Sequence, residues 1–343
     1  MSDKTKIEWA DATVNAINGC SVHSPGCKNC YAMKLAGTRM RNHATREGLT
    51  DQTKAGPIWN GNVRLHEPAL LQPLRWTAPR RIFWNAHGDT FHESVADSWI
   101  DQVFAVCALT PQHTHMILTK RSARMREYLD GSWQSRGIEH MKLWQKRPAG
   151  YGTLLQTVNG VLPNVWLGVS VEDQTRADEH RESFRATPAA AKFVSYEPAL
   201  GPVNWSGWEF VHQIIAGGES GPNARPAHPQ WFWDTRDWCL PNDVAFFFKQ
   251  WGHWAPVCAM HDDLIEDLYD PAPKHSPEAS RRCKVDQCVL HADGQRFNGK
   301  AMFKLPAFQA GSGAMTMFAV NKRRAGRLLD GIEHNAMPEV HHG

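Results

Sequence analysis

The sequence predicts an α/β protein built as a full or partial (β/α) barrel. Apolar segments typical of buried strands alternate with longer helical segments between residues 80 and 252. This alternation indicates parallel strands with helices packed outside them. Polar residues follow nearly every predicted strand, and the carboxyl ends of the strands are where a β/α barrel builds its site. A doubly wound open sheet would give the same alternation, but these polar strand ends favour the barrel.

The predicted strands are short runs with continuous rather than alternating apolar residues, as expected for a sheet covered on both faces. They cover residues 13–19, 80–86, 113–121, 164–172, 191–198, 211–221 and 244–252. Helices are predicted between them, at 94–109, 122–129, 174–186 and 228–240. A further helix is expected after the first strand and the cysteine-rich segment that follows it, over residues 31–42.

Two parts of the chain are expected. Residues 1–252 would form the barrel, and residues 253–343 an appended region of loops with a C-terminal tail. The second part is rich in Pro, Asp, Cys and His, and it has little apolar sequence of its own. Zinc binding could therefore stabilise it.

The overall composition limits the classes of function. The chain has 343 residues, 42% of them hydrophobic, with a formal net charge of only +3, so any nucleic-acid-binding surface must be local. No apolar run approaches the roughly 18 residues needed to cross a bilayer. The amino terminus has no apolar segment of the kind that a secretory signal carries. We therefore expect a cytoplasmic protein without a membrane partner. It has eight cysteines, and those that are clustered are expected to serve metal or redox chemistry rather than disulfides.

Three cysteines crowd the segment GCSVHSPGCKNCYA, residues 19–32, where the first strand passes to the first helix. Cys20, Cys27 and Cys30 could hold three corners of a [4Fe–4S] cluster and leave the fourth iron open to S-adenosylmethionine (SAM) or to substrate. A zinc ion with a fourth ligand such as His23 is an alternative. Unliganded thiols are another, although the glycine, proline and asparagine around these cysteines favour a surface loop over a core.

Further cysteines and histidines lie late in the chain. The residues concerned are Cys258, His261, Cys283, Cys288 and His291. Together they could form a tetrahedral zinc site, although their spacing matches no standard zinc finger. The alternative is that they are unpaired thiols and surface histidines.

Basic stretches lie at residues 39–46 and 321–331, and both could contact a nucleic acid backbone. Ordinary solvated helix faces are the alternative interpretation. Charged residues at the predicted strand ends could bind a cofactor: Lys120 its phosphate or carboxylate, and either Glu172 or Glu197 a pair of ribose hydroxyls. Helix capping or a structural role is the alternative for these residues.

Several segments together resemble a phage-type, three-cysteine, radical-SAM-like protein family of mostly unknown function. They are the segment TKIEWADATVNAINGCSVHSPGCKNCYA and the later segments RRIFWNAHGDTFHE, LTKRSARM, NVWLGVSVE, FVSYEPALGP, IIAGGESGPNARP and FFFKQWG. The resemblance implies a barrel of radical-SAM type that binds a [4Fe–4S] cluster and SAM.

The resemblance also implies roles for individual residues. The segment AGGESG contains Gly217, Gly218, Glu219 and Ser220. In radical-SAM enzymes a Gly-Gly-Glu segment holds the SAM amino group, so Glu219 would bind this ammonium and Lys120 the SAM carboxylate. Tyr31, directly after the third cysteine, is the aromatic candidate for cofactor binding.

The expected function is therefore a radical-SAM enzyme. One-electron reduction by a partner reductant would cleave SAM to methionine and a 5′-deoxyadenosyl radical, which would abstract hydrogen from a substrate. A nucleic acid or nucleotide substrate, in modification or repair, is favoured by the resemblance and by the local basic stretches. Two other classes compete. One is a zinc-stabilised nucleic-acid-binding protein without redox chemistry, and the other is a barrel hydrolase or nuclease that uses the strand-end carboxylates.

Overall fold

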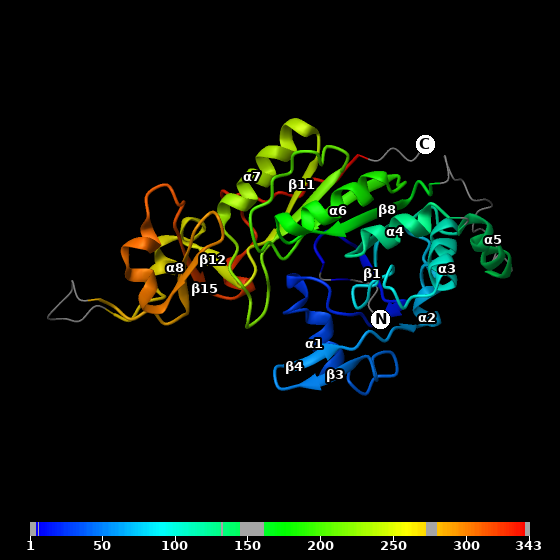
Figure 1. Ribbon diagram of the computed structural model, residues 1–343, viewed down its shortest axis with the longest axis horizontal. Coiled ribbons are helices and arrows are strands. Elements are labelled where there is room, and N and C mark those ends of the chain that lie inside the picture. Colours follow the sequence, from blue (N-terminus) through cyan, green and yellow to red (C-terminus); the bar gives the residue numbers. More distant parts are fainter. Residues whose placement is uncertain (1–4, 6, 132, 145–160, 272–279, 340–343) are drawn as a thin grey trace.

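The computed structural model describes the chain except for residues 1–4, 6, 132, 145–160, 272–279 and 340–343. A large α/β body carries a smaller β-rich unit at one end, and a short arm projects from the body (Figure 1). No helix in the described ranges is long and apolar enough to cross a membrane.

A seven-stranded parallel sheet forms the centre of the α/β body. Its strands are β1 (Ala12–Val14), β6 (Arg81–Trp84), β7 (Thr114–Thr119), β8 (Val165–Ser170), β9 (Ala191–Tyr196), β10 (Gln213–Gly217) and β11 (Ala245–Gln250), in that order across the sheet. A doubly wound sheet would reverse its order at a switch point, and this sheet does not. Because β1 and β11 are not paired with each other, the sheet is a partial barrel. The expected β/α barrel is thus confirmed in its partial form.

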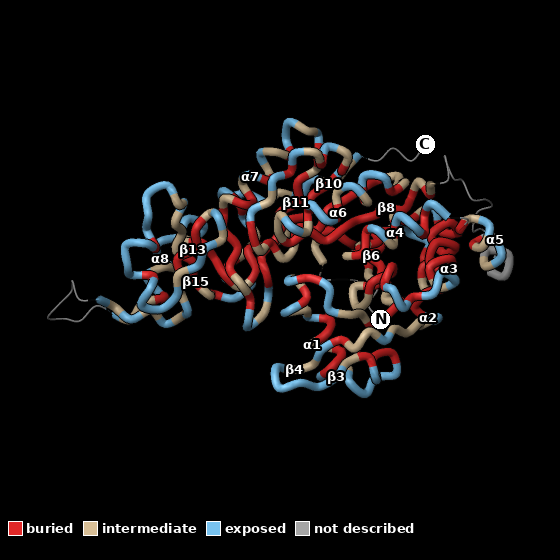
Figure 2. Tube along the Cα trace, in the orientation of Figure 1, coloured by how far each residue is buried: buried red, intermediate tan, exposed pale blue. Residues whose placement is uncertain are grey.

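Helices cover the outer face of this sheet. They are α3 (Asp97–Ala108), α4 (Ser122–Leu129), α5 (Trp133–Trp144), α6 (Gln174–Ala186) and α7 (Pro229–Cys239). Their apolar residues form one core with the outward-facing strand residues, such as Ile82, Ile117 and Val194. Figure 2 shows the strands buried along most of their length between these layers. The continuous apolar runs of the sequence reflect this burial on both faces.

The inner face of the sheet has a separate, aromatic core. Phe83, Phe193 and Phe247 point inward from three different strands and pack around Trp9 of the amino-terminal segment. The rings of Trp9 and Phe83 meet edge to face with centroids 4.7 Å apart. These residues form an aromatic plug that fills part of the space inside the partial barrel.

The arm comprises residues 28–66, which begin directly after the second cysteine. It contains α1 (Tyr31–Gly37) and the hairpin of β3 (Thr50–Thr53) and β4 (Gly56–Trp59). Strand β5 (Arg64–Leu65) pairs with β2 (Ile17–Asn18) and ties the arm to the body. A small core of Ala32, Met33, Ala36, Leu49 and Trp59 holds α1 on the hairpin. The short helix α2 (Glu67–Leu70) then leads back to the barrel.

The β-rich unit follows β11. Its antiparallel strands are β12 (Trp254–Pro256), β15 (Met315–Ala319), β13 (Gln287–Leu290) and β14 (Arg296–Asn298), accompanied by α8 (Asp262–Glu266) and α9 (Lys322–Ala325). Single turns of 3-10 helix occur at Pro25–Cys27, Pro73–Arg75, Leu240–Asn242, Val257–Ala259, Gly299–Phe303 and Leu305–Phe308. Residues 253–343 thus contain a β-sheet and two short helices, and not only the loops that their composition predicts. Its last segment returns to the barrel, where Asn335 forms an isolated β-bridge with Phe247 of β11.

Candidate functional site

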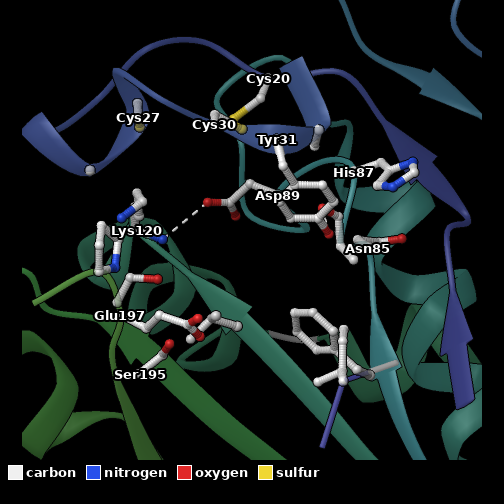
Figure 3. A pocket seen from close by; sticks show the side chains of 18 of the residues that line it. Cys20, Cys27, Cys30, Tyr31, Asn85, His87, Asp89, Lys120, Ser195 and Glu197 are labelled. Atoms are coloured by element: carbon white, nitrogen blue, oxygen red, sulfur yellow. Dashed lines mark hydrogen bonds between the residues drawn. The ribbon is translucent and has the colours of Figure 1, made fainter. Parts of the chain in front are cut away.

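A cavity of about 980 Å³ opens at the carboxyl ends of the strands. Nine of the predicted site residues line it: Cys20, Cys27, Cys30, Tyr31, Lys120, Glu197, Gly218, Glu219 and Ser220. Gly217 lies immediately before this group, as the last residue of β10. Figure 3 shows the cysteines on one side of the cavity and Ser195 with Glu197 on the opposite side. The sheet thus gathers residues from the whole length of the barrel at one place.

The three cysteines belong to one loop over the cavity, and each sulfur has a hydrogen-bonding neighbour. The Arg121 guanidinium donates to the Cys20 Sγ at 3.8 Å, and the backbone N–H of Met33 donates to the Cys30 Sγ at 3.5 Å. The Ser24 hydroxyl lies 3.7 Å from the Cys27 Sγ. Hydrogen bonds to sulfur stabilise thiolates and tune iron–sulfur clusters. The donor set therefore fits a thiolate-ligated cofactor.

Burial favours the protonated form of two of these thiols, Cys20 and Cys30. Burial, reinforced by the nearby Asp89 carboxylate, raises the pKa of Cys20 to about 12. Burial also raises the pKa of Cys30 above its usual range. Bound iron would supply the positive charge that thiolates need in such surroundings.

The described residues contain no group of three His, Cys, Asp or Glu side chains that could hold a single metal ion. A mononuclear zinc site needs its ligands gathered around one atom at about 2.0–2.3 Å. In a cluster of several irons each thiolate binds a different iron atom, so its ligands are spread around the cluster. Within the described residues, the three cysteines line one cavity but do not form the close group that a single zinc ion requires.

Two glycines allow close packing of the loops around the cavity, one against backbone and one against a side chain. A Cβ at Gly218 would lie 2.0 Å from the Trp251 carbonyl oxygen. A Cβ at Gly26 would lie 2.5 Å from a carboxylate oxygen of Glu172, which is fully buried below the cysteine loop. Glycine is therefore required at both positions for steric reasons.

Glu219 is bound to the cysteine loop. Its carboxylate accepts hydrogen bonds from Arg225 at 2.6–2.9 Å and from the Asn29 side chain at 3.0 Å. Burial alone would raise the pKa of Glu219, but the Arg225 hydrogen bonds outweigh burial and lower it. Arg225 also donates to the Pro25 carbonyl at 3.1 Å. Glu219 thus joins the end of β10 to the segment that carries the cysteines.

The other charged residues of the cavity are paired. Lys120 pairs with Glu172, and Lys249 donates to both carboxylate oxygens of Glu197 at 2.7 Å. The Lys249–Glu197 pair lines the cavity and presents a positive and a negative group side by side, whereas Glu172 is fully buried. Such a surface is complementary to a zwitterion, because the ligand's carboxylate and ammonium can each find an opposite charge.

A second network supports the cysteine loop. The buried Arg121 pairs with Asp89 at 3.0 Å and donates to the Ser21 hydroxyl at 2.8 Å. The Asp89 carboxylate also accepts from Thr119 and from the Lys120 backbone N–H. Sequence reasoning noted these polar groups at the strand ends but missed that Arg121 reaches the cysteine loop. In the cysteine loop, the sequence feature that could have indicated the contact with Arg121 is Ser21, next to Cys20.

Comparison with known proteins places the chain in a family. The family model described as "Protein of unknown function (DUF5131)" matches residues 4–338. The chain belongs to the DUF5131 family. Because the match runs from the amino-terminal plug to the returning tail, membership in DUF5131 covers the barrel, the arm and the β-rich unit alike. No curated protein and no solved structure matches the chain.

The late cysteines and histidines of this DUF5131 chain lie in the β-rich unit. Cys288 is fully buried within β13, and the buried His291 ring is within 2.9 Å of the Ala307 carbonyl. Cys258 and His261 are exposed, and the half-buried Cys283 forms an isolated β-bridge with Tyr269. These positions explain His291 and Cys288 as packed residues of the sheet. The predicted zinc site remains a prediction.

Proposed function

We propose that the protein is an iron–sulfur enzyme of radical-SAM type. Cys20, Cys27 and Cys30 would hold a [4Fe–4S] cluster, and SAM would bind beside it in the cavity. When bound, a cluster of this kind supplies the one-electron reduction that cleaves SAM. The observation that carries the proposal is the placement of three thiols on one loop, facing a cavity at the carboxyl ends of a partial β/α barrel.

The chain's own residues would bind and orient the amino acid part of SAM. The resemblance implies Glu219 for the ammonium and Lys120 for the carboxylate, but Glu219 is held by Arg225 and Asn29, and Lys120 pairs with Glu172. The ion pair of Lys249 with Glu197 can serve both groups of the ligand. Ser170 and Ser195 line the cavity at neighbouring strands, and their small side chains leave room for the rest of the ligand. Below them, Trp9 and Phe83 exclude water from the reaction site.

The hydrolase alternative has less support. A general base must be free to accept a proton. Four carboxylates lie around the cavity, and each is paired with a cation: Asp89 with Arg121, Glu172 with Lys120, Glu197 with Lys249 and Glu219 with Arg225. This arrangement suits charge complementarity better than proton abstraction.

Iron and sulfide analysis after anaerobic reconstitution tests the proposal. The unaltered protein is expected to be brown and to bind about four irons and four sulfides, as a [4Fe–4S] cluster requires. Single Cys20→Ala, Cys27→Ala and Cys30→Ala substitutions are each expected to abolish stable cluster binding. The exposed Cys258 serves as a matched control, and Cys258→Ala should leave the iron content unchanged. A colourless parent protein, or full iron in Cys27→Ala, would disprove the ligand assignment.

A further inference from the structure

The basic side chains that line the cavity are paired with carboxylates, whereas several basic side chains of the arm are not. The four cations that line the cavity each pair with a carboxylate: Lys120 with Glu172, Arg121 with Asp89, Lys249 with Glu197 and Lys322 with Glu8. The cavity is therefore locally neutral. A ligand that carries several negative charges would find no unpaired cation among these four side chains.

The arm is strongly basic. Residues 28–66 contain seven lysine and arginine residues against two acidic residues, a formal net charge of +5, whereas the whole chain has only +3. Lys28, Arg39, Arg41 and Lys54 are exposed. Within the described ranges, none of these four forms an ion pair with a carboxylate. Positive charge is thus concentrated beside the cysteine loop, and these four side chains carry it without a carboxylate partner in the described part of the chain.

A buried cation, Arg46, adds to the positive charge of the arm. Arg46 is only 5% exposed, and no described carboxylate pairs with it. Its guanidinium donates to Thr45 and contacts His87, which lines the cavity, while its Nε has no hydrogen-bond partner. An unpaired buried charge is costly, so a nearby anion would be strongly favoured at this junction of arm and cavity.

An aromatic ring stands where the arm meets the cavity. Tyr31 is the first residue of α1 and is 59% exposed, although it lines the cavity wall. Its hydroxyl donates to the Ala86 carbonyl at 3.1 Å, which fixes the ring. Basic side chains with an exposed aromatic ring are the combination that binds single-stranded nucleic acid, through phosphates and stacked bases.

We propose that the arm binds single-stranded nucleic acid. Its phosphates would lie along Lys28, Arg39 and Arg41, and one base would stack on Tyr31 at the cavity mouth. The neutral cavity, at about 980 Å³, is large enough to take a nucleotide-sized group. That this nucleic acid is the substrate rests on the proposed function, but its binding to the arm does not require the cluster.

Fluorescence anisotropy with a labelled, mixed-sequence 12-nucleotide DNA or RNA tests the inference on the full chain without added iron. The decisive variant is R39E/R41E. Since each phosphate contact on a single strand contributes roughly fivefold to affinity near 0.1 M salt, this variant, which removes two, should bind at least tenfold more weakly. The slope of log affinity against log salt should become shallower by about 1.4, or about 0.7 for each lost phosphate contact on a single strand. A second variant, K54E, should weaken binding in the same direction.

K300E/K304E is the matched control, because both lysines are exposed and lie in the β-rich unit away from the arm (Figure 1). It should bind like the parent protein. The inference is overturned if the parent protein does not bind the oligonucleotide, or if the control weakens binding as much as R39E/R41E. Equal binding of polyglutamate would also overturn it, in favour of an acidic protein partner. Iron analysis is independent of this binding assay. The oligonucleotide affinities can therefore still be interpreted if the proposed function proves wrong.

Discussion

At the scale of single residues, His115 shows how a buried polar group is fixed in one charge state. It is fully buried within β7. The Trp84 indole N–H donates to its Nδ1 at 3.0 Å, and its Nε2 lies 3.0 Å from the Thr110 hydroxyl. Since Nδ1 accepts a hydrogen bond, the proton of the neutral ring is on Nε2. Burial lowers the pKa of His115 to about 3.

This environment predicts a pH dependence of stability. Because the folded-state pKa lies below the unfolded value of about 6.5, the contribution is complete above that pH and is lost as the pH falls towards 3. Between pH 7.5 and pH 5 the parent protein should lose about 2 kcal/mol through His115. His115→Gln cannot titrate and should lack this part of the pH dependence in urea unfolding. The exposed His261→Gln should follow the parent protein, and identical pH profiles for all three would contradict the assignment.

The cavity residues illustrate what sequence can predict at this scale. Cys20, Lys120, Glu197 and Glu219 were expected to converge because each lies next to the carboxyl end of a predicted strand, and such ends meet in a barrel. All four line the cavity. Their individual partners were not predictable, because Asn29 and Glu219, which form a hydrogen bond, are 190 positions apart in the chain.

At the scale of elements, strands and helices of the barrel follow from the sequence more readily than those of the arm. Six apolar runs between residues 80 and 252 correspond to β6 through β11. The hairpin strand β3 has the sequence TDQT, with mostly exposed side chains, so it has neither an apolar run nor an alternation. The arm is held by a few contacts of α1 with β4 instead. Such a small, polar element has no periodic signal.

The segment after β10 gives a prediction about the cysteine loop. Glu219 and Arg225 bind this loop at Asn29 and at the Pro25 carbonyl. Hydrogen bonds between charged groups contribute about 1.5–3 kcal/mol. Glu219→Gln should therefore speed hydrogen exchange of the loop amides of Cys27 and Cys30 by roughly tenfold or more.

Glu197→Gln is the control for this effect. Its carboxylate lies in the same cavity, but its hydrogen bonds go to Lys249 and Gln250 of β11. It should leave exchange in the cysteine loop unchanged. If both variants speed exchange equally, or neither does, the link between Glu219 and the loop is not what orders it.

At the scale of the whole molecule, an open sheet leaves two edge strands, and edges of this kind promote association with other chains. The returning tail covers one of them. The Phe248 N–H donates to the His334 carbonyl, and the Ala336 N–H donates to the Phe246 carbonyl. The tail also buries Leu329 completely. The division at residue 252 that composition predicts therefore separates the barrel from a tail that stabilises it.

Truncation after residue 325 tests this role of the tail. It keeps α9 but removes the residues that pair with β11, together with the Trp251 hydrogen bonds to Gly326 and Leu328. Losing several hydrogen bonds and a buried leucine should lower the melting temperature by at least about 5 °C. The uncovered edge should also make the protein self-associate in size-exclusion chromatography with light scattering. Truncation after residue 339 keeps the pairing and should behave like the full chain. A monomeric 1–325 protein with unchanged melting would show that β11 needs no cover.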